Sequence, residues 1–128
     1  MSNMEPKSTL ERYWQLMQTN DFHKASEMLS EDYVCHWPQS GEVIRGRENF
    51  VLINAHYPAQ GKWRFSLNHI LCEGEQVVTD VSVTDGVIKG RALTFSTVRD
   101  GLIAKQVEYW PDDFAPQEWR KEWVDIDD

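Results

Sequence analysis

The chain has 128 residues, a length that suits one domain with a single core and is too short for two. Its formal net charge of −8 argues against nucleic acid or an anionic membrane surface as a partner, because both require clustered Lys and Arg. Six Trp, five Phe and four Tyr exceed what a small core usually holds, and such an excess often lines a cavity.

The first third of the chain is predicted to be mainly helical. A capping-box pattern at Ser8 and Glu11 begins a helix. The apolar face of this helix has helical spacing and consists of Leu10, Tyr13, Trp14 and Met17. A second short helix follows Asp21, and a third runs from Gly46 to Pro58.

The remaining segments are predicted to be strands. Residues 32–37 alternate, so that Tyr33, Cys35 and Trp37 share one face, and residues 42–45 form a short strand. Three or four longer strands follow from Lys62 to Trp110, joined by turns that include Asp100-Gly101. In the first of these, we expect one face to hold Trp63, Phe65, Leu67, His69 and Leu71.

This order predicts one α+β domain over residues 1–128, with helices covering an antiparallel sheet and flexible tails at 1–7 and 124–128. Trp119 and Trp123 lie four residues apart and predict a short C-terminal helix that is docked by two indoles.

Cys35 and Cys72 both fall inside predicted strands and lack metal-ligand or redox-motif spacing. They are expected to be reduced core thiols. The first residues have no apolar signal core, and no stretch could cross a bilayer. We therefore expect a cytoplasmic protein.

No phosphate-binding loop, nucleophile elbow or paired-cysteine metal motif occurs in the sequence. The four histidines are scattered, so no metal site and no cofactor are expected. His36 and His69 lie in predicted strands among aromatic residues, and they are the two histidines that could face a pocket.

The last strand holds the strongest candidate for chemistry. Alternation places Gln106, Glu108 and Trp110 on one face. If this face closes a cavity, burial would raise the pKa of Glu108 and suit it to acid–base catalysis. Alternatively, Glu108 pairs with Arg45 or Arg91 at the rim of the sheet and is structural.

Several short motifs occur in a characteristic order along almost the whole chain: Glu11-Arg12-Tyr13-Trp14, Asn20-Asp21-Phe22, Leu29-Ser30-Glu31-Asp32-Tyr33-Val34, Ile44-Arg45-Gly46-Arg47-Glu48, Asp100-Gly101-Leu102-Ile103 and Glu108-Tyr109-Trp110. With this order and spacing, the chain resembles the nuclear-transport-factor-2-like superfamily and, within it, the SnoaL-like polyketide-cyclase group.

The resemblance implies a cone, in which three N-terminal helices pack on a strongly curved antiparallel sheet and enclose a largely apolar pocket. It also implies a homodimer formed through the outer face of the sheet. The superfamily includes isomerases, dehydratases, epoxide hydrolases and cyclases, together with proteins that only bind a ligand or a partner.

Comparison with ketosteroid isomerases gives Tyr13 the position of the tyrosine that stabilises an oxyanion. The position of their general base falls at Trp37-Pro38, and that of their second acid falls near Thr94 or Phe95, so neither acid is present.

Limonene epoxide hydrolases use two acids and an arginine. Glu108 matches the last-strand acid, and the other two positions correspond to Val81 and Val83. Two known catalytic sets are therefore incomplete in this chain.

The sequence thus predicts a pocket for a small, apolar or partly polar ligand, in an acid–base isomerase, cyclase, dehydratase or hydrolase. Glu108 would transfer a proton, and Tyr13, Tyr33 or Gln106 would stabilise the developing charge. The predicted lining residues are Trp14, Met17, Tyr33, Trp37, Gln106 and Trp110. A ligand-binding protein without catalysis, or a protein-interaction module, are the alternatives.

Overall fold

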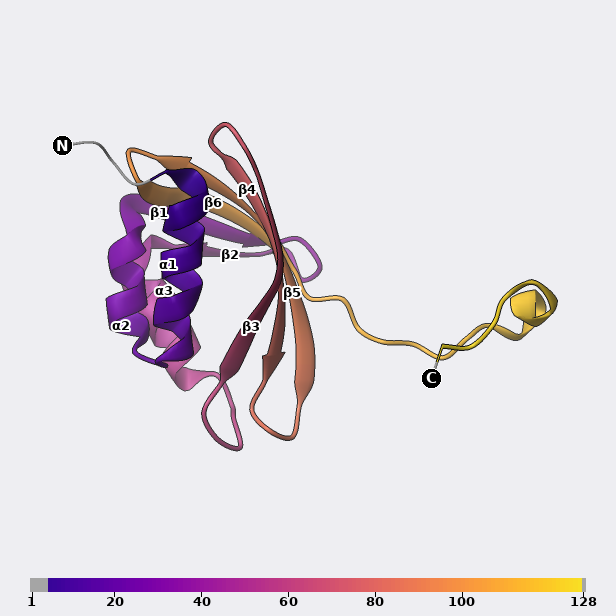
Figure 1. Cartoon of the computed structure of the whole chain (residues 1–128). Coiled ribbons are helices and arrows are strands. Elements are labelled where there is room, and N and C mark those ends of the chain that lie inside the picture. The colour runs from indigo at the N-terminus through magenta and orange to yellow at the C-terminus, as the bar shows by residue number, and fades with distance from the viewer. Residues whose placement is uncertain (1–4, 128) are drawn as a thin grey trace.

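The computed structural model describes residues 5–127 (Figure 1). Its helices are α1 (Pro6–Gln18), α2 (Phe22–Ala25), the 3₁₀ helix η1 (Ser26–Met28), α3 (Gly46–His56) and the 3₁₀ helix η2 (Glu118–Trp123). Its strands are β1 (Leu29–Trp37), β2 (Glu42–Arg45), β3 (Arg64–Glu73), β4 (Gln76–Thr84), β5 (Lys89–Arg99) and β6 (Leu102–Tyr109). These elements confirm the predicted α+β fold.

The helix boundaries follow local chemistry. α1 begins at Pro6, two residues before the predicted start, because the fixed backbone of proline suits the first turn of a helix. Lys7, assigned to the tail from sequence, therefore also belongs to α1, while residues 1–4 lie outside the described residues. α2 is capped as predicted, since the backbone N–H of Lys24 donates to Asp21 Oδ1 at 3.0 Å.

The six strands form one open sheet in the order β2-β1-β6-β5-β4-β3. All neighbouring strands are antiparallel except β1 and β6, which run parallel. The prediction of a wholly antiparallel sheet is therefore wrong for this pair. Hairpin signals reveal only pairings between consecutive strands, whereas β1 and β6 are joined through α3 and the rest of the sheet.

The helices cover one face of the bent sheet, which we call the inner face (Figure 1). The core lies between the two layers, and its largest fully buried side chains include Leu10 from α1, Leu29 and Tyr33 from β1, and Ile103 from β6. Val77, Val81 and Val83 share the buried face of β4, as their alternation predicted. No helix within residues 5–127 is long and apolar enough to cross a membrane.

One strand departs from the predicted phase. The pairing of β3 with β4 shifts between Leu67 and His69, which is a β-bulge. Before the bulge Phe65 faces the helices and packs on Trp14, with ring centroids 5.7 Å apart. After it, His69 and Leu71 pair with Asp80 and Val78 on the uncovered outer face, so the single face predicted for this strand is wrong.

The end of the chain also differs from the prediction. Residues 111–117 leave the body as an extended segment, followed by η2 and by residues 124–127, which turn back along the segment (Figure 1). Trp119 and Trp123 are 69% and 73% exposed, so η2 is not docked by its indoles. Both cysteines are free, but only Cys35 is buried, since Cys72 lies exposed near the end of β3.

Candidate functional site

A cavity of about 620 Å³ lies under the helices. α1, α3 and the inner face of the sheet supply its walls, which are mainly aromatic and aliphatic. Its lining includes Tyr13, Trp14, Met17, Tyr33, Cys35, Trp37, Ile44, Phe50, Ile53, Tyr57, Trp63, Phe65, Gln106, Glu108 and Trp110. Its volume falls in the range of pockets that hold small molecules.

Glu108 is the one carboxylate among the buried lining residues of this cavity. It lies on β6, directly opposite Thr94 of β5 in the strand register. The Thr94 hydroxyl donates to Glu108 Oε2 at 2.7 Å, and the Trp37 indole N–H donates to Oε1 at 3.1 Å. Each carboxylate oxygen therefore accepts a hydrogen bond from a neutral donor.

Within residues 5–127, no Lys or Arg lies within ion-pair distance of Glu108. Arg91, one of the two partners considered from sequence, instead pairs with Asp80, with Nη2 3.0 Å from Oδ2. Burial raises the pKa of Glu108 above its ordinary value, and hydrogen bonding from Thr94, Trp37 and Trp110 opposes this rise only in part.

A second polar chain runs beside Glu108. The Tyr33 hydroxyl donates to Gln106 Oε1 at 2.6 Å, and Gln106 Nε2 donates to Ser96 Oγ at 3.1 Å. All three side chains are buried. Because these groups satisfy each other, Tyr33 and Gln106 serve mainly to hold the wall of the cavity rigid.

Tyr13 differs from Tyr33 because its hydroxyl makes no hydrogen bond within residues 5–127. No fully enclosed side-chain polar atom in this part of the chain lacks a partner, so the Tyr13 hydroxyl must reach the cavity space. Burial, with a further contribution from the nearby charge of Glu108, raises the pKa of Tyr13. Tyr13 therefore remains a neutral hydrogen-bond donor aimed at the cavity.

The structure brings all eight sequence-predicted site residues to this one cavity: Tyr13, Trp14, Met17, Tyr33, Trp37, Gln106, Glu108 and Trp110. The two histidines lie elsewhere. His36 pairs with Val107, and His69 pairs with Asp80, so both belong to the outer face.

Sequence reasoning missed the residues that support the site from neighbouring strands. Thr79, Thr94 and Ser96 are fully buried on the inner face, and Thr79 Oγ1 accepts a hydrogen bond from the Trp14 indole at 3.3 Å. The sequence signal that could have revealed them is the small hydroxyl residues at alternate positions of β4 and β5. A polar side chain on the buried face of a strand needs a hydrogen-bond partner, so these residues mark polar contacts inside the fold.

Charged residues surround the cavity where it opens to solvent. The exposed residues among its lining include Asp112 and Asp113, together with Lys89 and Arg91, whose side chains occupy outer positions of β5. No group of three or more His, Cys, Asp or Glu residues within 5–127 is arranged to hold a metal ion.

Comparison with known proteins agrees with this architecture. Residues 10–106 match the model of the SnoaL-like domain family. No curated protein matches the chain.

The fold is similar to several solved structures. A candidate ketosteroid isomerase from Kribbella flavida is 24% identical, with a TM-score of 0.88, covering 96% of this chain and 90% of its own. A nuclear-transport-factor-2-like protein of unknown function from Burkholderia xenovorans is 27% identical, with a TM-score of 0.80. Its alignment covers 96% of this chain and 95% of the Burkholderia chain.

An LEH-like epoxide hydrolase from Mycobacterium tuberculosis is 18% identical, with a TM-score of 0.67, covering 83% of this chain and 82% of its own. By the match over residues 10–106, the chain belongs to the SnoaL-like domain family.

Proposed function

We propose that the chain binds a small, largely apolar carbonyl compound in the cavity and moves one of its protons. The observation that carries this proposal is a buried Glu108 that contacts two neutral donors and no cation. Burial raises the pKa of such a carboxylate, which brings it closer to the range that suits a general base that accepts and returns a proton.

In the proposed step, a C–H bond next to the carbonyl breaks and its proton moves to Glu108. The electron pair left on carbon becomes an enolate, whose negative charge resides mainly on the former carbonyl oxygen. Tyr13 donates a hydrogen bond to this oxygen, because its raised pKa keeps the hydroxyl protonated. Return of the proton from Glu108 to another carbon completes an isomerisation. In a substrate with a β-hydroxyl group, the enolate electrons instead form a C=C bond as the C–O bond breaks, and Glu108 returns the proton to the departing hydroxyl, which leaves as water and completes a dehydration.

A second candidate is a binding protein without catalysis. It is supported by Thr94, Val81 and Val83, which occupy positions where the resemblance to isomerases and epoxide hydrolases would call for further catalytic side chains. In that case Glu108 anchors a ligand hydroxyl, and the apolar walls supply most of the affinity.

The two candidates differ in whether bound ligand exchanges protons. The probe is 2-tetralone, a bicyclic ketone with exchangeable protons next to its carbonyl, incubated with the protein in D₂O and followed by proton NMR. Catalysed exchange should rise with pH as Glu108 ionises, and Glu108→Gln should lower its rate by at least about a hundredfold. Tyr13→Phe should lower the rate while leaving its pH dependence in place.

Glu75→Gln is the matched control, because Glu75 is exposed in the turn between β3 and β4, away from the cavity. It should exchange the probe at the wild-type rate. Binding of 2-tetralone without catalysed exchange would favour the binding protein. Exchange that survives in Glu108→Gln would remove Glu108 from the mechanism.

A further inference from the structure

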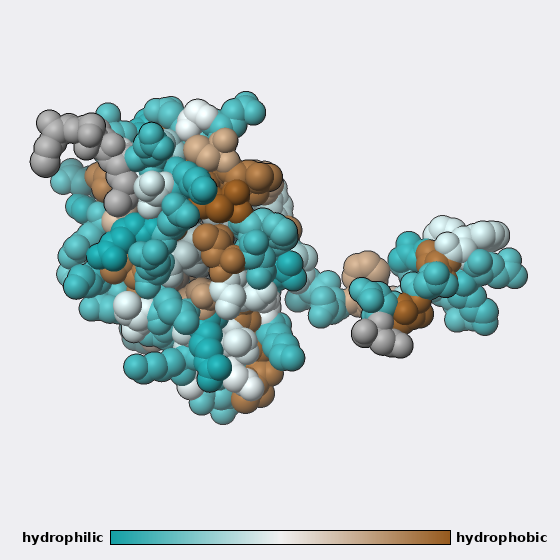
Figure 2. All heavy atoms as spheres, viewed as in Figure 1, coloured by the Kyte–Doolittle hydropathy of each residue, from teal (hydrophilic) through white to brown (hydrophobic). Residues whose placement is uncertain are grey.

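The C-terminal arm, residues 111–127, exposes a large apolar surface on a short segment. Phe114, Trp119 and Trp123 are all more than two thirds exposed, and Val124 and Ile126 are exposed as well. Figure 2 shows hydrophobic residues on this arm, which stands clear of the body. Aromatic side chains gathered in this way on one segment are typical of a surface that meets a partner.

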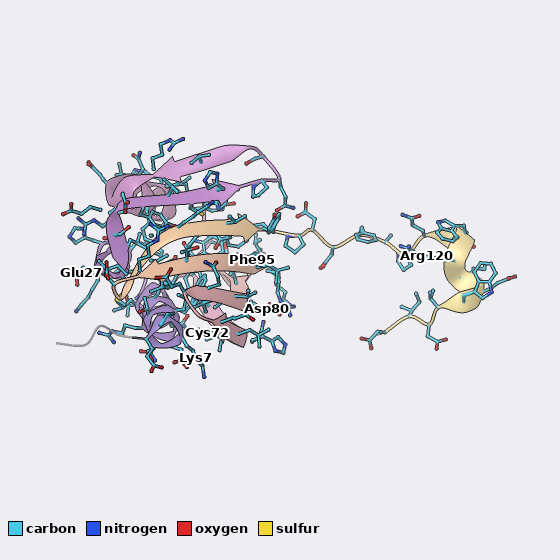
Figure 3. The ribbon with its side chains drawn as sticks, turned by 90° about the horizontal axis from the view of Figure 1, so that it is seen from above. Lys7, Glu27, Cys72, Asp80, Phe95 and Arg120 are labelled. Carbon is cyan, nitrogen blue, oxygen red and sulfur yellow. The ribbon has the colours of Figure 1, made fainter. Side chains whose placement is uncertain are left out.

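The direction of the arm is set by the body at its root. The Gln39 side chain makes two hydrogen bonds with the backbone of Trp110. Its Nε2 donates to the Trp110 carbonyl at 3.1 Å, and its Oε1 accepts from the Trp110 N–H. From this point the arm runs away from the helices (Figure 1), and Figure 3 shows Arg120 well beyond the sheet residues Asp80 and Phe95. The arm is therefore aimed away from the core of its own chain.

The outer face of the sheet is the other large uncovered apolar surface of the molecule. The strand register aligns one apolar row across four strands, composed of Leu71, Val78, Phe95 and Val107. Phe95 packs edge-on against Tyr109, with ring centroids 6.1 Å apart, yet it remains 47% exposed. No helix of residues 5–127 covers this row.

The two surfaces carry opposite charge, although the whole chain is acidic. The arm holds six acids, Asp112, Asp113, Glu118, Glu122, Asp125 and Asp127, against two bases, Arg120 and Lys121. The outer positions of β3–β6 hold five bases, Arg64, Lys89, Arg91, Arg99 and Lys105, against two acids, Glu73 and Asp80. This complementarity favours contact between an arm and an outer face.

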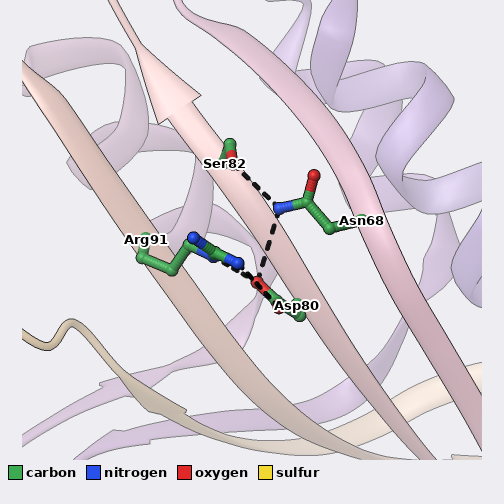
Figure 4. Close-up of polar contacts among 4 residues, drawn as sticks. All are labelled: Asn68, Asp80, Ser82 and Arg91. Carbon is green, nitrogen blue, oxygen red and sulfur yellow. Dashed lines mark hydrogen bonds and ion pairs between the residues drawn. The ribbon is translucent and has the colours of Figure 1, made fainter. Parts of the chain in front are cut away.

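One part of the outer face is already organised. Arg91 pairs with Asp80 across β5 and β4, and the Asn68 amide at the bulge donates to Ser82 at 2.8 Å and also contacts Asp80 (Figure 4). Asp80 neutralises Arg91 and holds it in place. The remaining basic residues of this face are left without an ion-pair partner among residues 5–127.

We infer that the C-terminal arm of one copy lies across the outer sheet face of a second copy, and that the exchange is reciprocal. A two-fold pair of chains places each arm on the other sheet, which covers both apolar surfaces at once and matches acidic with basic residues. This inference does not depend on the proposed catalytic function.

The first test locates the arm by photo-cross-linking. p-Benzoylphenylalanine is placed at position 119 of the full chain, and this variant is mixed with ¹⁵N-labelled wild-type protein before irradiation. The inference predicts cross-linked peptides that join the light arm to heavy strands β4–β6. Cross-links confined to one light chain would show that the arm folds back on its own sheet and would overturn the inference.

The second test measures self-association by sedimentation velocity. Trp119→Ser with Trp123→Ser should weaken association by at least about tenfold, because buried aromatic side chains dominate most interfaces. Phe95→Glu, at the centre of the apolar row, should weaken it similarly. Leu52→Ser is the matched control, since Leu52 is 46% exposed on α3, away from the outer face, and should have no effect.

Circular dichroism of each variant separates a loss of association from a loss of folding. A wild-type chain that sediments as a monomer at about tens of micromolar would contradict the inference. A dimer that persists unchanged without the two indoles would show that the sheet faces associate directly and that the arm has no part in the contact.

Discussion

Removing the hydrogen bond from Thr94 to Glu108 tests how the walls of the cavity set the pKa of Glu108. Thr94→Val keeps the shape of the side chain and removes the hydroxyl that donates to Glu108 Oε2 at 2.7 Å. A hydrogen bond to a charged group contributes about 1.5–3 kcal/mol, whereas one to a neutral group contributes about 0.5–1.5 kcal/mol. The substitution should therefore raise the pKa of Glu108 further, because the ionised form loses more than the protonated form.

The effect on stability follows from proton linkage. Burial raises the pKa of Glu108 in the folded state, so between its unfolded and folded values the native chain binds more protons than the unfolded chain. The free energy of unfolding therefore falls as pH rises through this window. In Thr94→Val the window reaches a higher pH. The variant should be less stable than wild type by about 1.5–3 kcal/mol above the window, and by less at acid pH.

Urea unfolding at a series of pH values measures both free energies, and the carboxyl ¹³C shift of Glu108 reports its titration. Thr79→Val is the matched control. Thr79 lies opposite Thr94 on the same buried face, but its hydroxyl accepts from the Trp14 indole and makes no bond to Glu108. Its penalty should not vary with pH across the window. If Thr94→Val gave an equally constant penalty, the argument for an ionising, desolvated Glu108 would fail.

Three further substitutions test the buried contacts of the fold by urea unfolding. Tyr33→Phe leaves the buried oxygen of Gln106 without its donor and should cost about 1–3 kcal/mol. Asn20→Ala removes both hydrogen bonds to the Trp63 backbone, made at 2.7 and 2.8 Å, and leaves an alanine at φ 62°, so a loss of about 2–4 kcal/mol is expected. Leu10→Ala opens a space in the core, where Leu10 is fully buried, and should cost about 2–5 kcal/mol.

Much of the cavity wall could be predicted from sequence because the segments of β1 and β6 that supply it, residues 33–37 and 104–109, alternate without interruption. On β6 the predicted face of Gln106 and Glu108 is the buried one. On β1 the same holds for Tyr33 and Cys35. Period-two alternation is a local property, so neither assignment required knowledge of which strands become neighbours.

The bulge in β3 could not be predicted in this way. It lies at Asn68, whose side chain bonds to Ser82 and Asp80 of the adjacent strand. Before the pairing is known, Leu67, His69 and Leu71 look like one continuous face. A single extra residue moves every later side chain to the other face, which is why the phase of His69 was wrong.

The exposed position of the two C-terminal tryptophans could not be predicted for a different reason. A spacing of four residues is typical of a helix that packs by one face, but it does not say on which surface. In the structure Trp119 and Trp123 lie on η2, far from the core of their own chain. Sequence patterns detect an apolar face without revealing whether it is buried within one chain or between two.

The contacts of Glu108 depend on two strand pairings of opposite sense. The antiparallel pair of β5 and β6 sets Thr94 directly opposite Glu108. The parallel pair of β1 and β6 aligns His36 with Val107, so that the next residue of each strand, Trp37 and Glu108, meet on the inner face. A shift of β1 by one residue would turn the Trp37 indole outward and deprive Glu108 of the donor to Oε1. The strand pairing that hairpin signals could not reveal is therefore the one that completes the environment of the carboxylate.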